Sequence, residues 1–106
     1  MNLDKASVII PYYKKKNNIK QTIKSAISQT YPNLEIILIY DDEDQSDLIY
    51  LKSIKKLDKK SKIIVNKKNL GAGQSRNIGI LKSKGRFICF LDADDIWNKN
   101  KLLFQI

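Results

Sequence analysis

Short runs of apolar, often β-branched residues recur four times along this chain, and a stretch with helical spacing separates each run from the next. The runs lie at residues 6–10, 34–40, 61–66 and 86–91, and Pro11 is expected to end the first. Each connection is long enough for a crossover helix, which parallel strands require. The chain is therefore expected to fold as an α/β domain, with a mainly parallel sheet and helices on both faces.

Helix signals fill the connections between these runs. In the first connection, Asn18 is expected to cap a helix. Its apolar face comprises Ile19, Ile23, Ala26 and Ile27. In the second connection, helical spacing relates Leu48, Leu51, Ile54 and Leu57. The third connection predicts a helix over residues 75–84 that ends at Gly85, and another helix is expected from Trp97 onward. Trp97 itself is expected to anchor the core or a loop.

The composition predicts one small domain and excludes several kinds of site. The 106 residues, 42% hydrophobic and 29% charged, suit a soluble domain with a single core. No apolar stretch approaches the ~20 residues of a bilayer-spanning helix, and no signal peptide is recognised, so a cytoplasmic location is expected. One cysteine, Cys89, and no histidine exclude a disulfide framework, His-based acid–base catalysis and the usual zinc sites.

The charge is strongly basic, but the acids are more informative than the lysines. The formal net charge is +9, from 20 Lys and Arg against 11 Asp and Glu. A lysine-rich solvated surface explains this, and the alternative is an anionic partner: nucleic acid, a phosphorylated sugar donor or an acidic membrane face. Arg76 and Arg86 are the only arginines, which weakens the nucleic-acid interpretation. Most acids cluster at residues 41–47 and 92–95, which solubility does not explain.

Each apolar run is followed by a polar cluster. The clusters are PYYKKK (11–16), DDEDQSD (41–47), NLGAG (69–73) and DADD (92–95). In open α/β sheets, ligands bind outside the carboxyl ends of the strands, where the strand order switches. The four clusters are therefore expected to meet at one ligand site.

The last cluster places carboxylates one residue apart at a strand end. Asp92 and Asp94 can approach one Mg²⁺ or Mn²⁺ together with substrate phosphates. The alternative is that Asp94 or Asp95 caps a helix starting near Ile96. A cap needs one acid and this loop supplies three, which favours a metal or ligand site.

The other clusters leave two interpretations each. Carboxylates at 41–44 suit nucleoside recognition, or they form a turn that caps a helix near Asp47.

The stretch GAGQSR (71–76) is not a dinucleotide fingerprint, since Arg76 replaces its third glycine. Arg76 either meets a pyrophosphate near a helix N-terminus or forms a salt bridge with an acidic loop. Tyr12 and Tyr13 either stack on a base or pack within the protein. The lysines that follow them either attract phosphate or form a solvated run of charge.

Four segments together resemble the family 2 glycosyltransferases of the glycosyltransferase-A fold. They are SVIIPYYK (7–14), SAISQTYPNLEIILIYDD (25–42), NLGAGQSRNIGI (69–80) and KGRFICFLDADDIW (84–97). The segments occur in the family's order over nearly the whole chain. The resemblance implies a single domain over residues 1–106, the Rossmann-like nucleotide-binding half of that fold.

The resemblance also implies roles for individual residues. The nucleotide-sugar-binding residues are Pro11, Tyr13, Asp42, Arg76 and Asp92, and the metal ligands are Asp94 and Asp92. Tyr13 is expected to pack against uracil and Asp42 to accept a hydrogen bond from the base. Asp92 is expected to bind ribose and the metal, with Asp94 as the direct ligand of Mg²⁺ or Mn²⁺.

The chain departs from the family pattern at two places. Lys14 stands where the family usually has Asn, and Asp41-Asp42-Glu43-Asp44 stands where it usually has D-D-G-S. The missing glycine is expected to make the backbone of this loop less permissive.

The implied function is donor binding for glycosyl transfer. The donor is a nucleotide-diphosphate sugar of the UDP type, and the acceptor is a saccharide or a lipid-linked saccharide. The general base is expected outside this chain, in an acceptor-binding half. Peripheral association with the inner face of the membrane and self-association through exposed apolar surface are further expectations. The alternatives are a non-catalytic nucleotide- or metal-binding module and, less favoured, a basic nucleic-acid-binding domain, and no nucleic-acid partner is expected.

Overall fold

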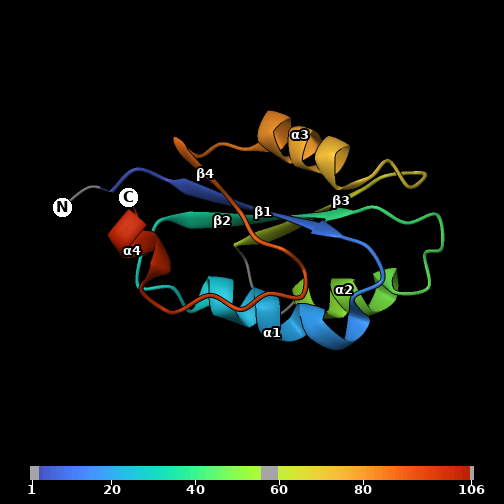
Figure 1. Ribbon diagram of the computed structural model, residues 1–106, viewed down its shortest axis with the longest axis horizontal. Helices are drawn as coiled ribbons and strands as arrows, with labels where there is room; N and C mark the ends of the chain where they lie inside the picture. Colours follow the sequence, from blue (N-terminus) through green and yellow to red (C-terminus); the bar gives the residue numbers. More distant parts are fainter. Residues whose placement is uncertain (1–2, 56–59, 106) are drawn as a thin grey trace.

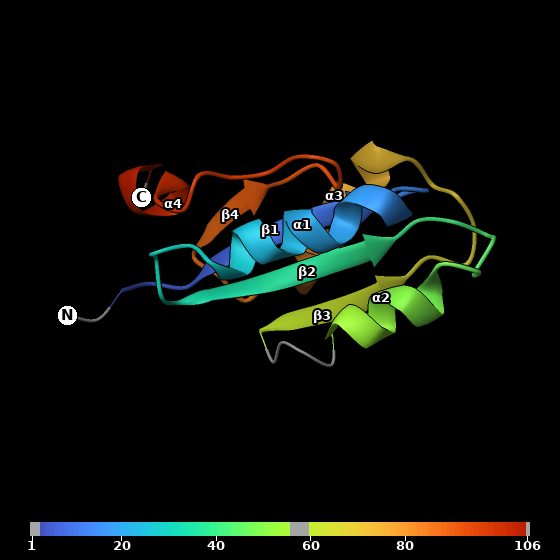
Figure 2. The ribbon, with the colours of Figure 1, turned by 90° about the horizontal axis from the view of Figure 1, so that it is seen from below.

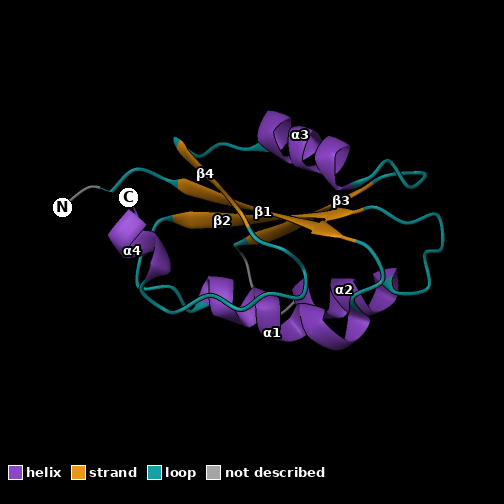
Figure 3. Cartoon of the chain, in the orientation of Figure 1, coloured by secondary structure: helices purple, strands orange, loops and turns teal. Residues whose placement is uncertain are grey.

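The computed structural model describes residues 3–55 and 60–105 and contains alternating strands and helices (Figures 1 and 3). In chain order the elements are β1 (Ala6–Tyr12), α1 (Lys16–Ile27), β2 (Leu34–Tyr40), α2 (Leu48–Lys55), β3 (Ser61–Val65), α3 (Ala72–Lys82), β4 (Phe87–Phe90) and α4 (Lys101–Gln105). The expected order of four strands and three connecting helices is confirmed.

The strands form one parallel sheet in the order β3-β2-β1-β4. The chain therefore moves outward from β1 to β3 and then returns to the other side of β1. This return places the switch in strand order between β1 and β4. In an open parallel sheet, that junction is where a ligand site forms beyond the strand ends.

Helices cover both faces of the sheet, as expected. Helix α3 lies on one face, and α1 and α2 lie on the other (Figure 1). The view from below shows α1 and α2 in front of the strands (Figure 2). The larger core lies on the side of α1 and α2, whereas the smaller one, on the side of α3, is built from Ile9, Ile37 and Ile39.

Helix α3 packs very closely on β1. A Cβ atom built on Gly79 of α3 would overlap the side chain of Ile9 on β1. The absence of a side chain at this position thus sets how near the helix lies to the sheet. Because the N-terminus of α3 faces the switch point, this close packing also positions the start of the helix.

The expectation that Pro11 ends the first strand is wrong, since β1 continues to Tyr12. A proline inside a central strand normally loses a ladder hydrogen bond. Here the Ile9 carbonyl points toward β4 and accepts a hydrogen bond from the backbone N–H of Leu91. Backbone groups alternate between the two sides of a strand, so the backbone nitrogen of Pro11 also points toward β4. Pairing with β4 ends at Ile9, so no partner at Pro11 is lost.

Helix starts differ most from the expectations. Helix α1 begins at Lys16 after Lys15, without a side-chain cap, so Asn18 lies inside the helix and does not cap it. Helix α3 begins at Ala72, earlier than expected, because Gly71 adopts a φ of 92° and turns the chain into the helix. The last helix starts at Lys101, later than expected. Leu57 lies outside the described residues.

Trp97 belongs to the main core and is 8% exposed, which confirms its expected anchoring role. Over residues 3–55 and 60–105, the structure contains no helix that combines the length and apolar character needed to cross a membrane.

Candidate functional site

A cavity of about 230 Å³ lies where β1 and β4 end. Five residues that the sequence predicts as ligand contacts line it: Pro11, Tyr13, Arg76, Asp92 and Asp94. The other lining residues are Tyr12, Lys15, Asp41, Ala72 and Ala93. The structure thus brings together residues from the ends of three strands and the first turns of α3 at the switch point. Their individual roles toward a ligand stay predictions.

Asp42 lies beside the cavity instead of lining it, as far as the described residues define its wall. The residue is 6% exposed, and its Oδ1 accepts a 3.0 Å hydrogen bond from the backbone N–H of Asp44. Its Oδ2 lies 3.5 Å from the Nζ of Lys14. The expected contact between Asp42 and a base therefore stays a prediction, and Lys14 is the neighbour of its outer oxygen.

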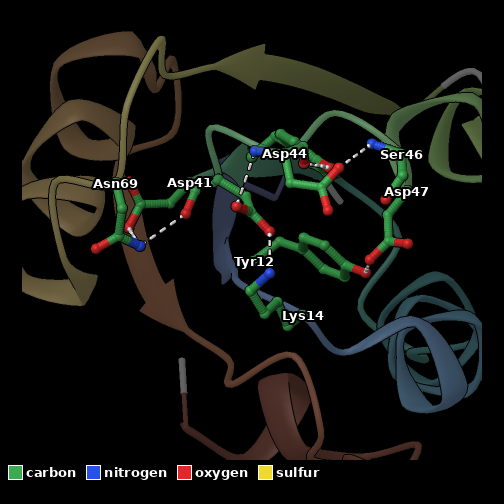
Figure 4. A network of polar contacts seen from close by, with 9 residues as sticks. Tyr12, Lys14, Asp41, Asp44, Ser46, Asp47 and Asn69 are labelled. Carbon is green, nitrogen blue, oxygen red and sulfur yellow. Dashed lines mark hydrogen bonds and ion pairs between the residues drawn. The ribbon is translucent and has the colours of Figure 1, made fainter.

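Asp41, to which the sequence assigns no role of its own, organises the loop between β3 and α3. Its carboxylate accepts hydrogen bonds from the side-chain amides of Asn66 and Asn69 at 3.0 and 3.3 Å. It also accepts from the backbone N–H groups of Leu70 and Gly71 at 2.7 and 2.9 Å. Figure 4 shows Asn69 turned toward Asp41. One buried acid therefore fixes the loop that delivers α3 to the cavity.

The sequence contains only a weak signal for this arrangement. Residues 66–73 have the composition of a loop, and Asn66 follows Asp41 by 25 positions. Nothing in that spacing pairs the two. The available signal is chemical: a carboxylate buried at a strand end needs several N–H donors, and this loop supplies backbone and amide donors together.

Two stacked tyrosines hold the acidic loop that follows β2. The rings of Tyr12 and Tyr40 lie 5.4 Å apart with an interplanar angle of 14°. The Tyr12 hydroxyl donates to Asp47 at 2.7 Å (Figure 4). The Tyr40 hydroxyl donates to the Asp44 carbonyl at 2.6 Å. Burial and the Asp47 carboxylate raise the pKa of Tyr12 well above its usual value, so its hydroxyl remains a donor.

Successive side-chain turns replace the glycine that this loop lacks. Asp42 accepts from the N–H of Asp44, and Asp44 accepts from the N–H of Ser46 at 2.9 Å. The second bond lowers the pKa of Asp44. Among the described non-glycine residues, Lys14 alone has a positive φ, so no position of the acidic loop requires glycine. The less permissive backbone expected without glycine therefore brings no strained φ to the described residues of this loop.

Two exposed ion pairs lie on the cavity rim. The guanidinium of Arg76 is 3.5 Å from Asp92 Oδ1, and Lys15 Nζ is 3.4 Å from Asp94 Oδ2. The expected salt bridge between Arg76 and an acidic loop is thus present, and the expected contact of Arg76 with a pyrophosphate stays a prediction. Because both pairs are largely solvated, they are weak and leave the four groups available to a charged ligand.

The helix-capping interpretation of the last acidic cluster is wrong. Asp95 Oδ1 accepts from the N–H of Ile96, but no described helix begins there, and the next starts at Lys101. The carboxylates of Asp92 and Asp94 instead border the cavity.

These two carboxylates fit an oxygen-liganded metal that is shared with a ligand. Within the described residues, no group of three His, Cys, Asp or Glu side chains is close enough to hold a metal ion by itself. Mg²⁺ in nucleotide sites is typically held by one or two carboxylates plus substrate phosphates. Asp92 and Asp94 suit a site of this kind, in which the protein supplies only part of the metal ligands.

The segment after β4 is fastened to α1. The Thr22 hydroxyl donates to the carbonyl of Ala93 at 2.9 Å, and the N–H of Trp97 donates to Ser25 Oγ at 3.1 Å. A row of polar side chains on α1 thus holds the loop that carries Asp92 and Asp94. Sequence periodicity places Thr22 and Ser25 on the helix but does not reveal this contact.

Comparisons with known proteins agree with this geometry. The family model described as "Glycosyl transferase family 2" matches residues 7–105. An uncharacterised glycosyltransferase of Rickettsia bellii is 46% identical over 96% of this chain and 14% of its own length. The Escherichia coli UDP-Glc:alpha-D-GlcNAc-diphosphoundecaprenol beta-1,3-glucosyltransferase WfgD is 40% identical over 94% of this chain and 39% of its own length. The chain thus spans well under half the length of these relatives.

The crystal structure of residues 1–349 of S. aureus TarS in complex with UDP is similar in fold and sequence. It superimposes with a TM-score of 0.81 at 30% identity, covering 95% of this chain and 30% of that one. The parallel sheet and its flanking helices are therefore those of the glycosyltransferase-A fold. The sequence, the fold and the cavity at the switch point agree, and the chain belongs to glycosyltransferase family 2.

Proposed function

We propose that this chain is the donor-binding domain of a glycosyltransferase and binds a nucleotide-diphosphate sugar of the UDP type in the cavity between β1 and β4. One observation carries the proposal: Asp92, Asp94 and Arg76 border the same cavity as the half-exposed ring of Tyr13. Acids for a metal, a cation for phosphate and an aromatic face for a base are the three chemistries that a nucleoside diphosphate requires.

Each of these residues would contact a different part of the donor. Asp92 and Asp94 would hold Mg²⁺ or Mn²⁺ together with the diphosphate, and Arg76 would exchange its weak pair with Asp92 for a phosphate oxygen. Tyr13, which is 47% exposed, offers its ring to the base. When bound, the metal would stabilise the negative charge on the departing nucleoside diphosphate as a Lewis acid.

Transfer itself belongs to the larger protein. An acceptor hydroxyl would attack the anomeric carbon of the sugar, and the nucleoside diphosphate would leave with the bonding electrons. The general base that takes the hydroxyl proton is assigned outside this chain. The names of relatives support the donor and acceptor classes: TarS is solved with UDP and with UDP-GlcNAc, and WfgD is named for a diphosphoundecaprenol-linked acceptor.

Calorimetry with UDP tests the proposal. The chain should bind UDP with Mn²⁺ present, and chelation of the metal should abolish that binding. Asp94→Asn should weaken UDP binding at least tenfold, whereas Asp95→Asn, which removes a neighbouring acid outside the cavity lining, should not. An absence of UDP binding at millimolar concentration would overturn the proposal. So would salt-sensitive oligonucleotide binding that survives Asp94→Asn, which instead indicates a nucleic-acid-binding domain.

A further inference from the structure

Consecutive lysines after β1 contact different acids: Lys15 lines the cavity, whereas Lys14, like Asp42, lies beside it as far as the described residues define its wall. Lys15 Nζ lies 3.4 Å from Asp94, at the end proposed for the metal and the diphosphate. Lys14 Nζ lies 3.5 Å from Asp42 and 5.4 Å from the ring centroid of Tyr13. Lys14 therefore contacts Tyr13, which the proposed function assigns to the base, and Asp42, which the sequence predicts to accept a hydrogen bond from the base.

The backbone of Lys14 is held in an unusual conformation. Its φ of 52° lies in the left-handed region, which asparagine and glycine adopt far more readily than lysine. Such strained residues concentrate at functional sites, where the surrounding structure maintains them. From this backbone conformation the Lys14 side chain reaches Asp42, whose Oδ2 lies 3.5 Å from its Nζ.

The exposure of the two partners decides which of them meets a ligand. The Asp42 side chain is 8% exposed and already accepts from the Asp44 N–H, whereas the Lys14 side chain is 54% exposed. Asp42 and, to a smaller extent, Tyr13 raise the pKa of Lys14, so the ammonium group remains charged. The outward-facing polar group of this pair is a hydrogen-bond donor.

We infer that Lys14 is a specificity-determining residue of the nucleoside subsite: its ammonium group donates to a carbonyl oxygen of the base, and Asp42 orients it from behind. The inference rests on the proposed function, since it assigns a role within the same site. The ligand class is a nucleotide whose base carries exocyclic carbonyl oxygens, as uracil does. Adenine, which carries none, would leave the ammonium group without that partner.

The test measures the binding of UDP, ADP and inorganic pyrophosphate by calorimetry, each in the presence of Mn²⁺. Lys14→Met should weaken UDP binding about tenfold, the effect of one hydrogen bond to a charged group, and narrow the preference for UDP over ADP. Pyrophosphate, which has no base, should bind as before. Lys16→Met removes the same charge from a lysine that lies over the ring of Tyr50 instead of that of Tyr13, and it should change none of the three.

Lys14→Gly separates a role in binding from a role in folding. Glycine adopts the left-handed backbone without strain and carries no side-chain donor, so the urea midpoint should stay the same or rise while UDP binding still weakens. If both Lys14 variants bind UDP as tightly as the unaltered chain, with the same ratio of UDP affinity to ADP affinity, the inference is overturned. A parallel loss of pyrophosphate binding would also overturn it. If the unaltered chain fails to bind UDP, the proposed function itself fails.

Discussion

The hydroxyl of Thr22 on α1 donates a hydrogen bond to the carbonyl oxygen of Ala93, the residue between Asp92 and Asp94. Thr22 is fully buried and Ala93 is 4% exposed, so water does not replace this bond. A helix on one face of the sheet thereby holds the backbone between the two proposed metal ligands.

Thr22→Val should therefore reduce both stability and metal-dependent UDP binding. Valine keeps the shape of the side chain but leaves the Ala93 carbonyl unpaired, which costs about 1–3 kcal/mol. Urea denaturation and calorimetry measure the two effects. Thr30→Val removes a hydroxyl of the same kind that bonds Asn100 at the surface, and it should have little effect. Equal losses in the two variants would contradict this role of Thr22.

Asp41→Asn should destabilise the protein by about 3 kcal/mol, because an amide cannot accept from donors on both of its sides. Hydrogen exchange at the amides of Leu70 and Gly71, which donate to the two carboxylate oxygens, should accelerate in the variant. Glu43→Gln changes an exposed acid of the same strand-end cluster and should leave both amides protected. Protection that persists in Asp41→Asn would show that the loop is held by other contacts.

Gly79→Ala and Gly73→Ala should shift stability in opposite directions. The added methyl at Gly79 would overlap Ile9, and overpacking of this kind costs about 1–3 kcal/mol. At Gly73, also in α3, a Cβ meets nothing within 4 Å, so alanine should stabilise the helix by roughly 0.5–1 kcal/mol. Thermal denaturation of the two variants checks both signs. A loss of stability at both positions would contradict the open space described around Gly73.

Glu35 should make stability depend on acidic pH. Burial raises the pKa of Glu35, but hydrogen bonds from the Ser7 hydroxyl and the Lys84 N–H, with the Lys62 charge, outweigh burial and lower it overall. Because the pKa of Glu35 is lower in the folded state, its ionised form stabilises the protein at a pH above the unfolded-state pKa of about 4.5. That stability is lost as the pH falls through the folded value.

Urea midpoints measured from pH 7 to pH 3 should therefore fall below about pH 4.5, near the ordinary value for glutamate. Glu35→Gln should flatten the curve over this window. The same pH dependence in Glu35→Gln would assign the effect to other carboxylates, such as that of Asp44, whose pKa is also lowered.

The sheet and the place of the site follow from the sequence because they depend on coarse properties. Apolar runs of strand length separated by helices dictate parallel pairing, and parallel pairing collects the polar strand ends at one edge. Asp92, Asp94 and Arg76 could therefore be predicted to lie near one another. Their shared cavity follows from topology and needs no knowledge of individual contacts.

Contacts between distant segments could not be predicted in this way. The start of α3 depends on the positive φ of Gly71 and on the carboxylate of Asp41, which comes 30 positions earlier. The start of α1 has no capping side chain, so the asparagine at position 18 is a misleading signal. The pairing of Lys14 with Asp42 arises because a left-handed residue redirects the side chain, which spacing alone does not show.

The strand order has a consequence for how the site comes into being. The first residue of β1, Ala6, pairs with Phe87 at the start of β4, so the cavity requires the earliest strand of the chain and the last one together. During synthesis, β1, β2 and β3 can associate before the cavity exists. A nucleotide that binds there stabilises only the molecule in which this final long-range pairing has occurred, and its binding therefore reports completed folding.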